Sequence, residues 1–95
     1  MKKGYWLVRA DVSDMEKFTE YASRTPEALK KYGGAFLVRA GESEIVEGKS
    51  RSRNSVIEFP SYKNALDCWV SEDYQKAKQY RFGAATLDIV IIEGV

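Results

Sequence analysis

The chain has 95 residues, of which 44 % are hydrophobic and 31 % charged, the balance of a folded globular domain. Fifteen basic residues against fourteen acidic ones give a net charge of +1, which provides no electrostatic basis for binding nucleic acid or an anionic membrane. Histidine is absent, which removes the commonest metal ligand, the usual general base near neutral pH, and Ser-His or Cys-His nucleophile pairs. We therefore expect a single domain over residues 1–95, with no metal and no cofactor.

The compartment is predicted from the cysteine content and the N-terminus. Cys68 is the single cysteine and lies in an apolar helical stretch, so we expect a small buried side chain rather than a reactive thiol. One cysteine cannot form an internal disulfide, which fits a reducing compartment. The N-terminus is basic, but Arg9 and Asp11 interrupt its apolar run before a signal-peptide core could form, and no stretch has the length of a membrane span. A cytoplasmic protein without a membrane partner is expected.

The first third of the chain is predicted as a strand followed by a helix. Residues 5–12 alternate in polarity, which is typical of a strand with one buried face. Ser13 and Glu16 have the spacing of a capping box and predict a helix start. The predicted buried stripe of this helix consists of Met15, Phe18 and Ala22.

A proline and two glycines predict where that helix breaks and ends. Pro26 would kink a helix interior, so we expect a new helical segment with Thr25 as its cap. Gly33 and Gly34 then end the helix. The second strand is predicted at residues 35–40, with Phe36 and Val38 on one face and Leu37 and Arg39 on the other.

In the second half, one strand and one helix are joined by a clear boundary. Residues 55–59 form the predicted strand, Pro60 ends it, and Ser61 is the expected helix cap. The apolar face of this helix is predicted to consist of Tyr62, Ala65, Leu66 and Trp69. Ser71 caps a further helical segment, which presents Tyr74, Ala77 and Arg81 on one face and stops at Gly83 before a last strand at 86–93.

The loop between the two middle strands is interpreted as solvated. Residues 49–53 are basic but stand among three glutamates, so a phosphate-binding role is the minor interpretation. The short apolar piece Ile45-Val46 could pair as a ribbon.

The order β-α-β-β-α-β predicts an α+β, ferredoxin-like domain, a four-stranded antiparallel sheet with two helices on one face. The helices leave the opposite face bare, although it carries apolar side chains such as Tyr5, Leu7, Leu37 and Val56. Soluble monomers rarely expose an apolar patch of that size. A homodimer packed sheet to sheet about a two-fold axis is therefore predicted.

The strand parity also places Arg9, Arg39 and Glu58 on that second face. Charges inside a sheet-to-sheet interior must be paired, so a structural Arg–Glu network is the favoured interpretation. The alternative is a pocket in which Arg9 and Arg39 bind a small anion and Glu58, the candidate catalytic residue, acts as acid or base. Trp69, Tyr74 and Arg81 are the further candidates for lining such a pocket.

The chain resembles a family of short, mostly bacterial domains of unknown function in the dimeric α/β-barrel superfamily. The residues that carry the resemblance run in family order over nearly the whole chain: Gly4-Tyr5-Trp6, Tyr32-Gly-Gly-Ala-Phe-Leu-Val-Arg39-Ala-Gly41, Glu58-Phe-Pro-Ser61, Ala65, Trp69, Ser71-Glu-Asp-Tyr74-Gln and Arg81. Ala40 is a departure, since the family more often has glycine there. The resemblance implies a ferredoxin-like protomer that dimerises through its sheet, and it implies no established reaction.

Similar superfamily members include cofactor-free oxygenases, muconolactone-type isomerases, haem-degrading enzymes and dye-decolourising peroxidases, so fold alone does not fix function. The haem branches use an axial histidine, which this chain lacks. The favoured hypothesis is a homodimer that binds a small anionic or aromatic molecule, with a cofactor-free oxygenase or isomerase as its enzymatic form. The alternative is a non-enzymatic regulatory or protein-interaction module. RNA binding is disfavoured, because the third strand carries Glu58 where RNA-binding sheets display basic and aromatic residues.

Overall fold

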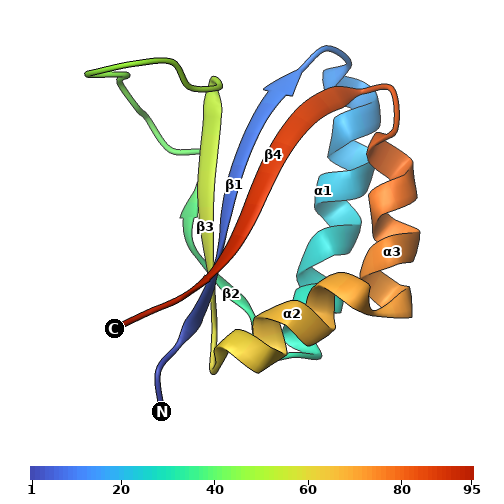
Figure 1. Ribbon diagram of the computed structural model, residues 1–95. Helices are drawn as coiled ribbons and strands as arrows, with labels where there is room; N and C mark the ends of the chain where they lie inside the picture. The colour runs from blue at the N-terminus through green and yellow to red at the C-terminus, as the bar shows by residue number, and fades with distance from the viewer.

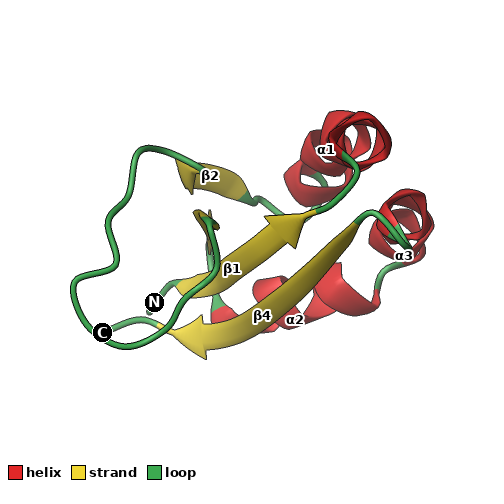
Figure 2. Cartoon of the chain, turned by 90° about the horizontal axis from the view of Figure 1, so that it is seen from above, coloured by secondary structure: helices red, strands yellow, loops and turns green.

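In the computed structural model, which describes all 95 residues, four antiparallel strands form a sheet with helices packed on one face (Figure 1). The elements are β1 (Gly4–Val12), α1 (Met15–Lys30), β2 (Ala35–Arg39), β3 (Arg53–Phe59), α2 (Tyr62–Val70), α3 (Glu72–Lys78), a 3-10 turn (Gln79–Arg81) and β4 (Ala85–Glu93). The strand order is β2-β3-β1-β4. This is the predicted ferredoxin-like arrangement, with the second helical connection divided into α2 and α3. Figure 2 shows α1 and α3 side by side on the same side of the sheet.

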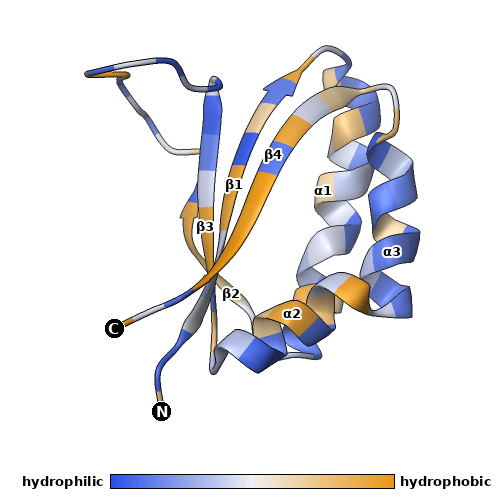
Figure 3. Ribbon diagram, viewed as in Figure 1, coloured by the Kyte–Doolittle hydropathy of each residue, from blue (hydrophilic) through white to orange (hydrophobic).

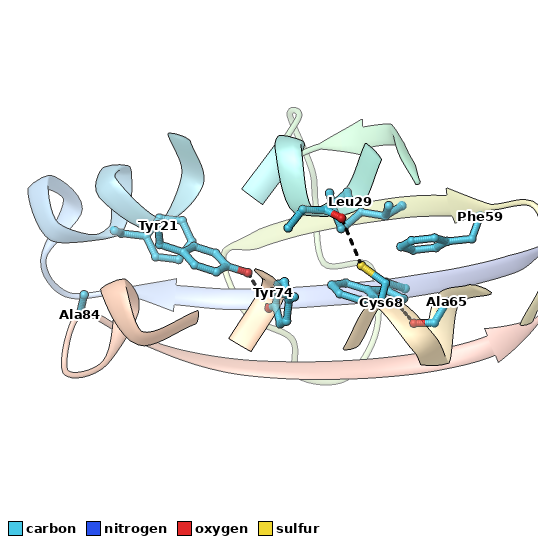
Figure 4. Close-up of a cluster of buried hydrophobic side chains, with 11 residues drawn as sticks. Tyr21, Leu29, Phe59, Ala65, Cys68, Tyr74 and Ala84 are labelled. Atoms are coloured by element: carbon cyan, nitrogen blue, oxygen red, sulfur yellow. Dashed lines mark hydrogen bonds between the residues drawn. The ribbon is translucent and has the colours of Figure 1, made fainter. Parts of the chain in front are cut away.

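The core lies between the sheet and the helices and is built around β1. Trp6 is fully buried and stands opposite Ile57 of β3 and Ile91 of β4. Its indole Nε1 donates a hydrogen bond to the carbonyl oxygen of Ala65 at 2.9 Å, which ties α2 to the central strand. Figure 4 shows the surrounding cluster, in which Tyr74 packs edge-on against Trp6 with 4.9 Å between ring centroids. The alternation of residues 5–12 therefore predicted the buried face of β1 correctly.

Helix α1 begins one residue later than the capping-box pattern predicted. The cap is Asp14, whose carboxylate accepts the N–H of Lys17 at 3.1 Å. The Ser13 hydroxyl instead donates to the carbonyl oxygen of Ala84 at 3.0 Å, and thereby fixes the start of α1 to the turn before β4. The predicted stripe was wrong at Met15, which is 51 % exposed. The buried side chains of α1 are Phe18, Tyr21, Thr25, Ala28 and Leu29.

The prediction of a break at Pro26 was wrong, because α1 runs without interruption from Met15 to Lys30. Proline has no N–H, so it cannot donate to the carbonyl oxygen of Ala22, its usual acceptor four residues earlier. The Arg39 guanidinium supplies a donor in its place, with 3.1 Å between Nη2 and the Ala22 oxygen. A contact from a distant strand thus replaces the missing intrahelical bond. As predicted, α1 gives way to a glycine turn, in which Gly33 has a φ of +78°.

The predicted parity of β2 was wrong at its end, because the strand contains a β-bulge. Phe36 pairs with Ile57, but Val38 pairs with Val56, so Leu37 is an extra residue between two consecutive partners. Beyond the bulge, each side chain lies on the face of the sheet opposite to the one that strict alternation predicts. Val38 therefore joins the open face of the sheet, and Arg39, opposite Ser55, lies on the face covered by helices. Arg39 consequently does not share a face with Arg9 and Glu58.

The helix caps of the second connection were predicted correctly, and the buried face of α2 was predicted correctly at Ala65 and Trp69 but not at Tyr62 and Leu66. Ser61 and Ser71 accept the N–H groups of Asn64 and Tyr74, each at 3.1 Å. The side chains that α2 buries fully are Ala65 and Cys68, whereas Tyr62 and Leu66 are exposed. The bond from Trp6 to the Ala65 carbonyl sets this rotation of the helix.

The connection between β2 and β3 forms no ribbon, contrary to the interpretation of Ile45-Val46. Residues 41–52 contain no strand, and Figure 1 shows this loop projecting from the sheet on the side away from the helices. Val46 is 89 % exposed. The loop returns to the sheet at Arg51, which forms ion pairs with Asp11 at 2.9 Å and Asp88 at 2.6 Å. None of the helices combines the length and the hydrophobicity that crossing a bilayer requires.

Candidate functional site

The sheet face opposite the helices is uncovered and carries an apolar row. Strand pairing aligns Leu7 with Val56 and Val90, and Val56 with Val38, across all four strands. Val38 and Val90 are 44 % and 49 % exposed, so half of their surface contacts solvent in the single chain. Figure 3 shows the hydrophobic colouring of β4 continuing along successive residues, as expected for a strand that is apolar on both faces.

Polar groups flank this open face toward the chain termini. The Tyr5 hydroxyl donates to Glu58 at 3.2 Å, and the Lys3 ammonium lies 3.5 Å from the same carboxylate. Burial, followed by the hydrogen bond to Glu58, raises the pKa of Tyr5. Arg9 is exposed on the same face and forms no ion pair. Glu58 is therefore already occupied within its own chain, by a tyrosine and a lysine rather than by an arginine.

A separate cavity lies on the other side of the sheet, between α1 and the covered face. Its volume is about 60 Å³, room for several water molecules. Apolar side chains from the sheet and from α1 form most of its wall: Trp6, Val8, Ala10, Phe18, Tyr21, Ala22, Phe36, Ile57 and Leu87. Its polar lining residues are Thr25, Arg39, Arg53 and Ser55. No carboxylate, histidine or cysteine lines it.

Two arginines mark the side on which this cavity opens. Arg39 is exposed and Arg53 half-buried, so both border the cavity and still reach solvent. Each guanidinium lies near an aromatic wall residue, Arg39 at 4.5 Å from the Phe36 ring centroid and Arg53 at 5.5 Å from that of Phe18. Neither arginine forms an ion pair. Two positive charges without an ion-pair partner therefore border an apolar cavity.

Of the residues that the sequence singled out, only Arg39 lines this cavity. Arg9 and Glu58 lie on the opposite face of the sheet, as described above. Trp69 and Tyr74 pack together in the core, with 5.2 Å between ring centroids. The sequence-derived set is thus divided between two faces of the sheet and the core.

Behind the cavity, a buried tyrosine pair connects α1 to α3. The hydroxyl groups of Tyr21 and Tyr74 share a hydrogen bond of 2.8 Å (Figure 4). Burial, followed by the proximity of Tyr21, raises the pKa of Tyr74, so this phenol stays neutral. Arg81 is buried beside the pair, 5.2 Å from the Tyr21 ring centroid, and its Nε has no hydrogen-bond partner.

Arg53 is the residue that sequence reasoning missed, because the run 49–53 was interpreted as a solvated loop. The signal was present in the period of β3. Residues 53, 55, 57 and 59 share one parity, opposite to that of Val56 and Glu58, which were placed on the bare face of the sheet. Extending the strand by two residues would have placed Arg53 on the covered face.

The remaining reactive side chain, Cys68, is fully buried in the core. Its thiol points at the carbonyl oxygen of Ala28, with 3.8 Å between the sulfur and the oxygen (Figure 4). Burial raises the pKa of the Cys68 thiol to about 12, which makes it a poor nucleophile near neutral pH. The prediction that Cys68 is buried is confirmed. Nowhere in the chain do three metal-ligating side chains gather.

Comparison with solved structures shows the same fold in several proteins. A protein of unknown function from Rhodopseudomonas palustris aligns with a TM-score of 0.77 and 13 % identity, over 99 % of this chain and 83 % of the other. SnoaB, a cofactor-independent oxygenase from Streptomyces nogalater, aligns with a TM-score of 0.66 and 10 % identity, over 97 % of this chain and 92 % of its own. A putative antibiotic biosynthesis monooxygenase from Nitrosomonas europaea aligns with a TM-score of 0.60 and 12 % identity, over 100 % of this chain and 93 % of its own.

These identities establish a shared fold and no shared activity. A comparison with proteins of curated function found no match. The family model described as "Domain of unknown function (DUF1330)" matches residues 3–95, nearly the whole chain. The ferredoxin-like sheet and this match agree with the resemblance found in the sequence, and the chain belongs to the DUF1330 family.

Proposed function

We propose that this domain binds a small molecule with an apolar body and one anionic group in the cavity between α1 and the sheet. The observation that carries the proposal is the pair Arg39 and Arg53, which border an apolar cavity and form no ion pair. A guanidinium matches a carboxylate in a two-point hydrogen bond, which supplies both affinity and orientation. The apolar walls would then contact one edge of the hydrocarbon or aromatic part of the ligand, because the volume of about 60 Å³ is too small to enclose a whole ring.

The cavity favours binding over proton-transfer catalysis by the protein. A general base must reach its proton within about 3 Å. The only carboxylate among the sequence candidates, Glu58, lies on the opposite face of the sheet and is held by Tyr5 and Lys3. Among the lining residues, the Tyr21 phenol and the two guanidinium groups are the strongest hydrogen-bond donors. A cofactor-independent oxygenation, the kind of activity ascribed to SnoaB, would have to draw its reactivity from the substrate itself, with the arginines stabilising negative charge.

The experiment compares a charged ligand with its neutral counterpart. Benzoate and benzamide are titrated into the ¹⁵N-labelled protein, and amide shifts are followed in α1, β2 and β3. We expect benzoate to shift residues around the cavity and benzamide to bind at least about tenfold more weakly, since a charge-assisted hydrogen bond contributes about 1.5–3 kcal/mol. The affinity of the Arg53→Gln variant for benzoate should be lower than that of the wild type by a similar factor.

Arg9 provides the matched control, because it is also an arginine without an ion pair but lies on the open face. Arg9→Gln should bind benzoate like the wild type. Equal affinity for benzoate and benzamide, or an equal loss in the Arg9 and Arg53 variants, would contradict the proposed site.

A second proposal concerns the open face, which we propose packs against the same face of a second copy. The support is the apolar row across all four strands, in which Val38 and Val90 are about half exposed. Soluble monomers rarely expose a large contiguous apolar patch. Light scattering over a dilution series to low micromolar concentration should give twice the chain mass of 10.8 kDa. Val90→Glu should give the monomer mass, whereas Val46→Glu, in the exposed loop, should not. A wild-type monomer at all concentrations would contradict the dimer and favour a protein-interaction module.

A further inference from the structure

We infer that Pro26 is a positioning residue that fixes Arg39 at the mouth of the cavity. The ligand measurement that tests this inference rests on the proposed function. The fixed position of Arg39 rests on the geometry of α1 and β2 alone. Pro26 lies in the interior of α1, where proline normally destabilises a helix. A helix that keeps such a residue, without a break, has a compensating contact.

The compensating contact is made by a charged residue of the candidate site. Because Pro26 has no N–H, the carbonyl oxygen of Ala22 lacks its regular donor and is free to accept another. Arg39 Nη2 donates to it at 3.1 Å. Ala22 and Arg39 both line the cavity, so the hydrogen bond lies at the site and not remote from it.

This contact explains why an exposed, flexible side chain is directed at the cavity. An arginine without an ion pair otherwise samples many rotamers, and immobilising it on binding would cost affinity. The Ala22 oxygen accepts one N–H of Arg39, the Phe36 ring lies 4.5 Å from the guanidinium carbon, and the remaining N–H groups stay available to an anion. With alanine at position 26, the backbone N–H would donate to the Ala22 oxygen, compete with Arg39 for it and weaken the hold on the guanidinium.

Two measurements test this inference in the variant Pro26→Ala, with Glu27→Ala as the matched control on the same helix. Glu27 is exposed, and its substitution changes no backbone donor. The first measurement is the ¹⁵N relaxation order parameter of the Arg39 Nε–H. We expect an ordered group in the wild type and in Glu27→Ala, and a fall below about 0.6 in Pro26→Ala. Alanine favours helix over proline, so the variant should melt no lower than the wild type.

The second measurement is benzoate affinity in a double-mutant cycle. Pro26→Ala should raise the Kd for benzoate about threefold or more although every lining residue is intact. Arg39→Gln should then raise the Kd by a smaller factor in the Pro26→Ala background than in the wild type. An unchanged order parameter of Arg39, or a lower one with unchanged benzoate affinity, would overturn the inference. If the wild type binds no benzoate, the proposed function fails as stated, and the order parameter alone decides whether Pro26 fixes Arg39.

Discussion

The hydrogen bond between Tyr21 and Tyr74 provides a quantitative test of how the core is held together. Tyr74 is fully buried, and its hydroxyl has Tyr21 as its hydrogen-bond partner at 2.8 Å. In the Tyr21→Phe variant this hydroxyl is left buried without that partner, which costs about 1–3 kcal/mol. Taking about 2 kcal/mol, we expect the melting temperature to fall by roughly 8–16 °C for a domain of this size. Tyr74→Phe should cost less, about 1 kcal/mol, because Tyr21 lines the cavity, where we expect a water molecule to replace the lost partner of its hydroxyl.

The assay is urea denaturation followed by tryptophan fluorescence, with Tyr62→Phe as the control at an exposed tyrosine. The control should change stability by less than about 0.5 kcal/mol. The double variant Tyr21→Phe/Tyr74→Phe removes both hydroxyls, so its loss should be smaller than the sum of the two single losses. Strict additivity, or a Tyr21→Phe loss no larger than that of the control, would show that the two hydroxyls do not depend on one another.

Three further predictions concern the backbone, the loop and the cysteine. Ala40 has a φ of +48°, a backbone conformation that costs a non-glycine residue about 1–2 kcal/mol. This strain exceeds the conformational entropy that a glycine would lose on folding, so Ala40→Gly should raise the melting temperature by a few degrees. A lower melting temperature would contradict the strain. The Ser52 N–H, followed by the Arg51 guanidinium, lowers the pKa of Asp11 in the folded state, so its contribution to stability is complete above the unfolded pKa and is lost as pH falls through the lowered one. In Arg51→Gln the Asp11 titration midpoint, measured by NMR, should rise, and an unchanged midpoint would count against the ion pair. Because the Cys68 pKa is raised to about 12, iodoacetamide at pH 8 should react with the unfolded chain much faster than with the native one, and equal rates would contradict its burial.

The sequence predicted the fold well wherever a local pattern was sufficient. Period-two alternation identified the buried face of β1, and serine caps located the starts of α2 and α3. These signals depend on neighbouring residues only. The element order then followed from the turns between them, and the sheet topology from the general rules for connections.

The candidate site was predicted less well, because its geometry depends on two non-local features. The bulge at Leu37 reverses the face of Arg39, and alternation alone does not reveal an extra residue. The uninterrupted α1 depends on a hydrogen-bond donor from β2, which no helix-propensity argument for Pro26 could contain. Both features involve the same arginine. Arg39 was therefore identified as a candidate for a reason, its position beside Arg9 and Glu58, that the structure does not support.

The bulge at Leu37 also makes the length of β2 a functional quantity. Substituting Leu37 would alter one side chain. Deleting it would instead restore strict alternation and move Val38 and Arg39 each to the opposite face of the sheet. A guanidinium would then move from the proposed binding cavity to the surface proposed for self-association, and a valine would move into the cavity. Deleting the Leu37 codon should accordingly be more damaging than substituting Leu37.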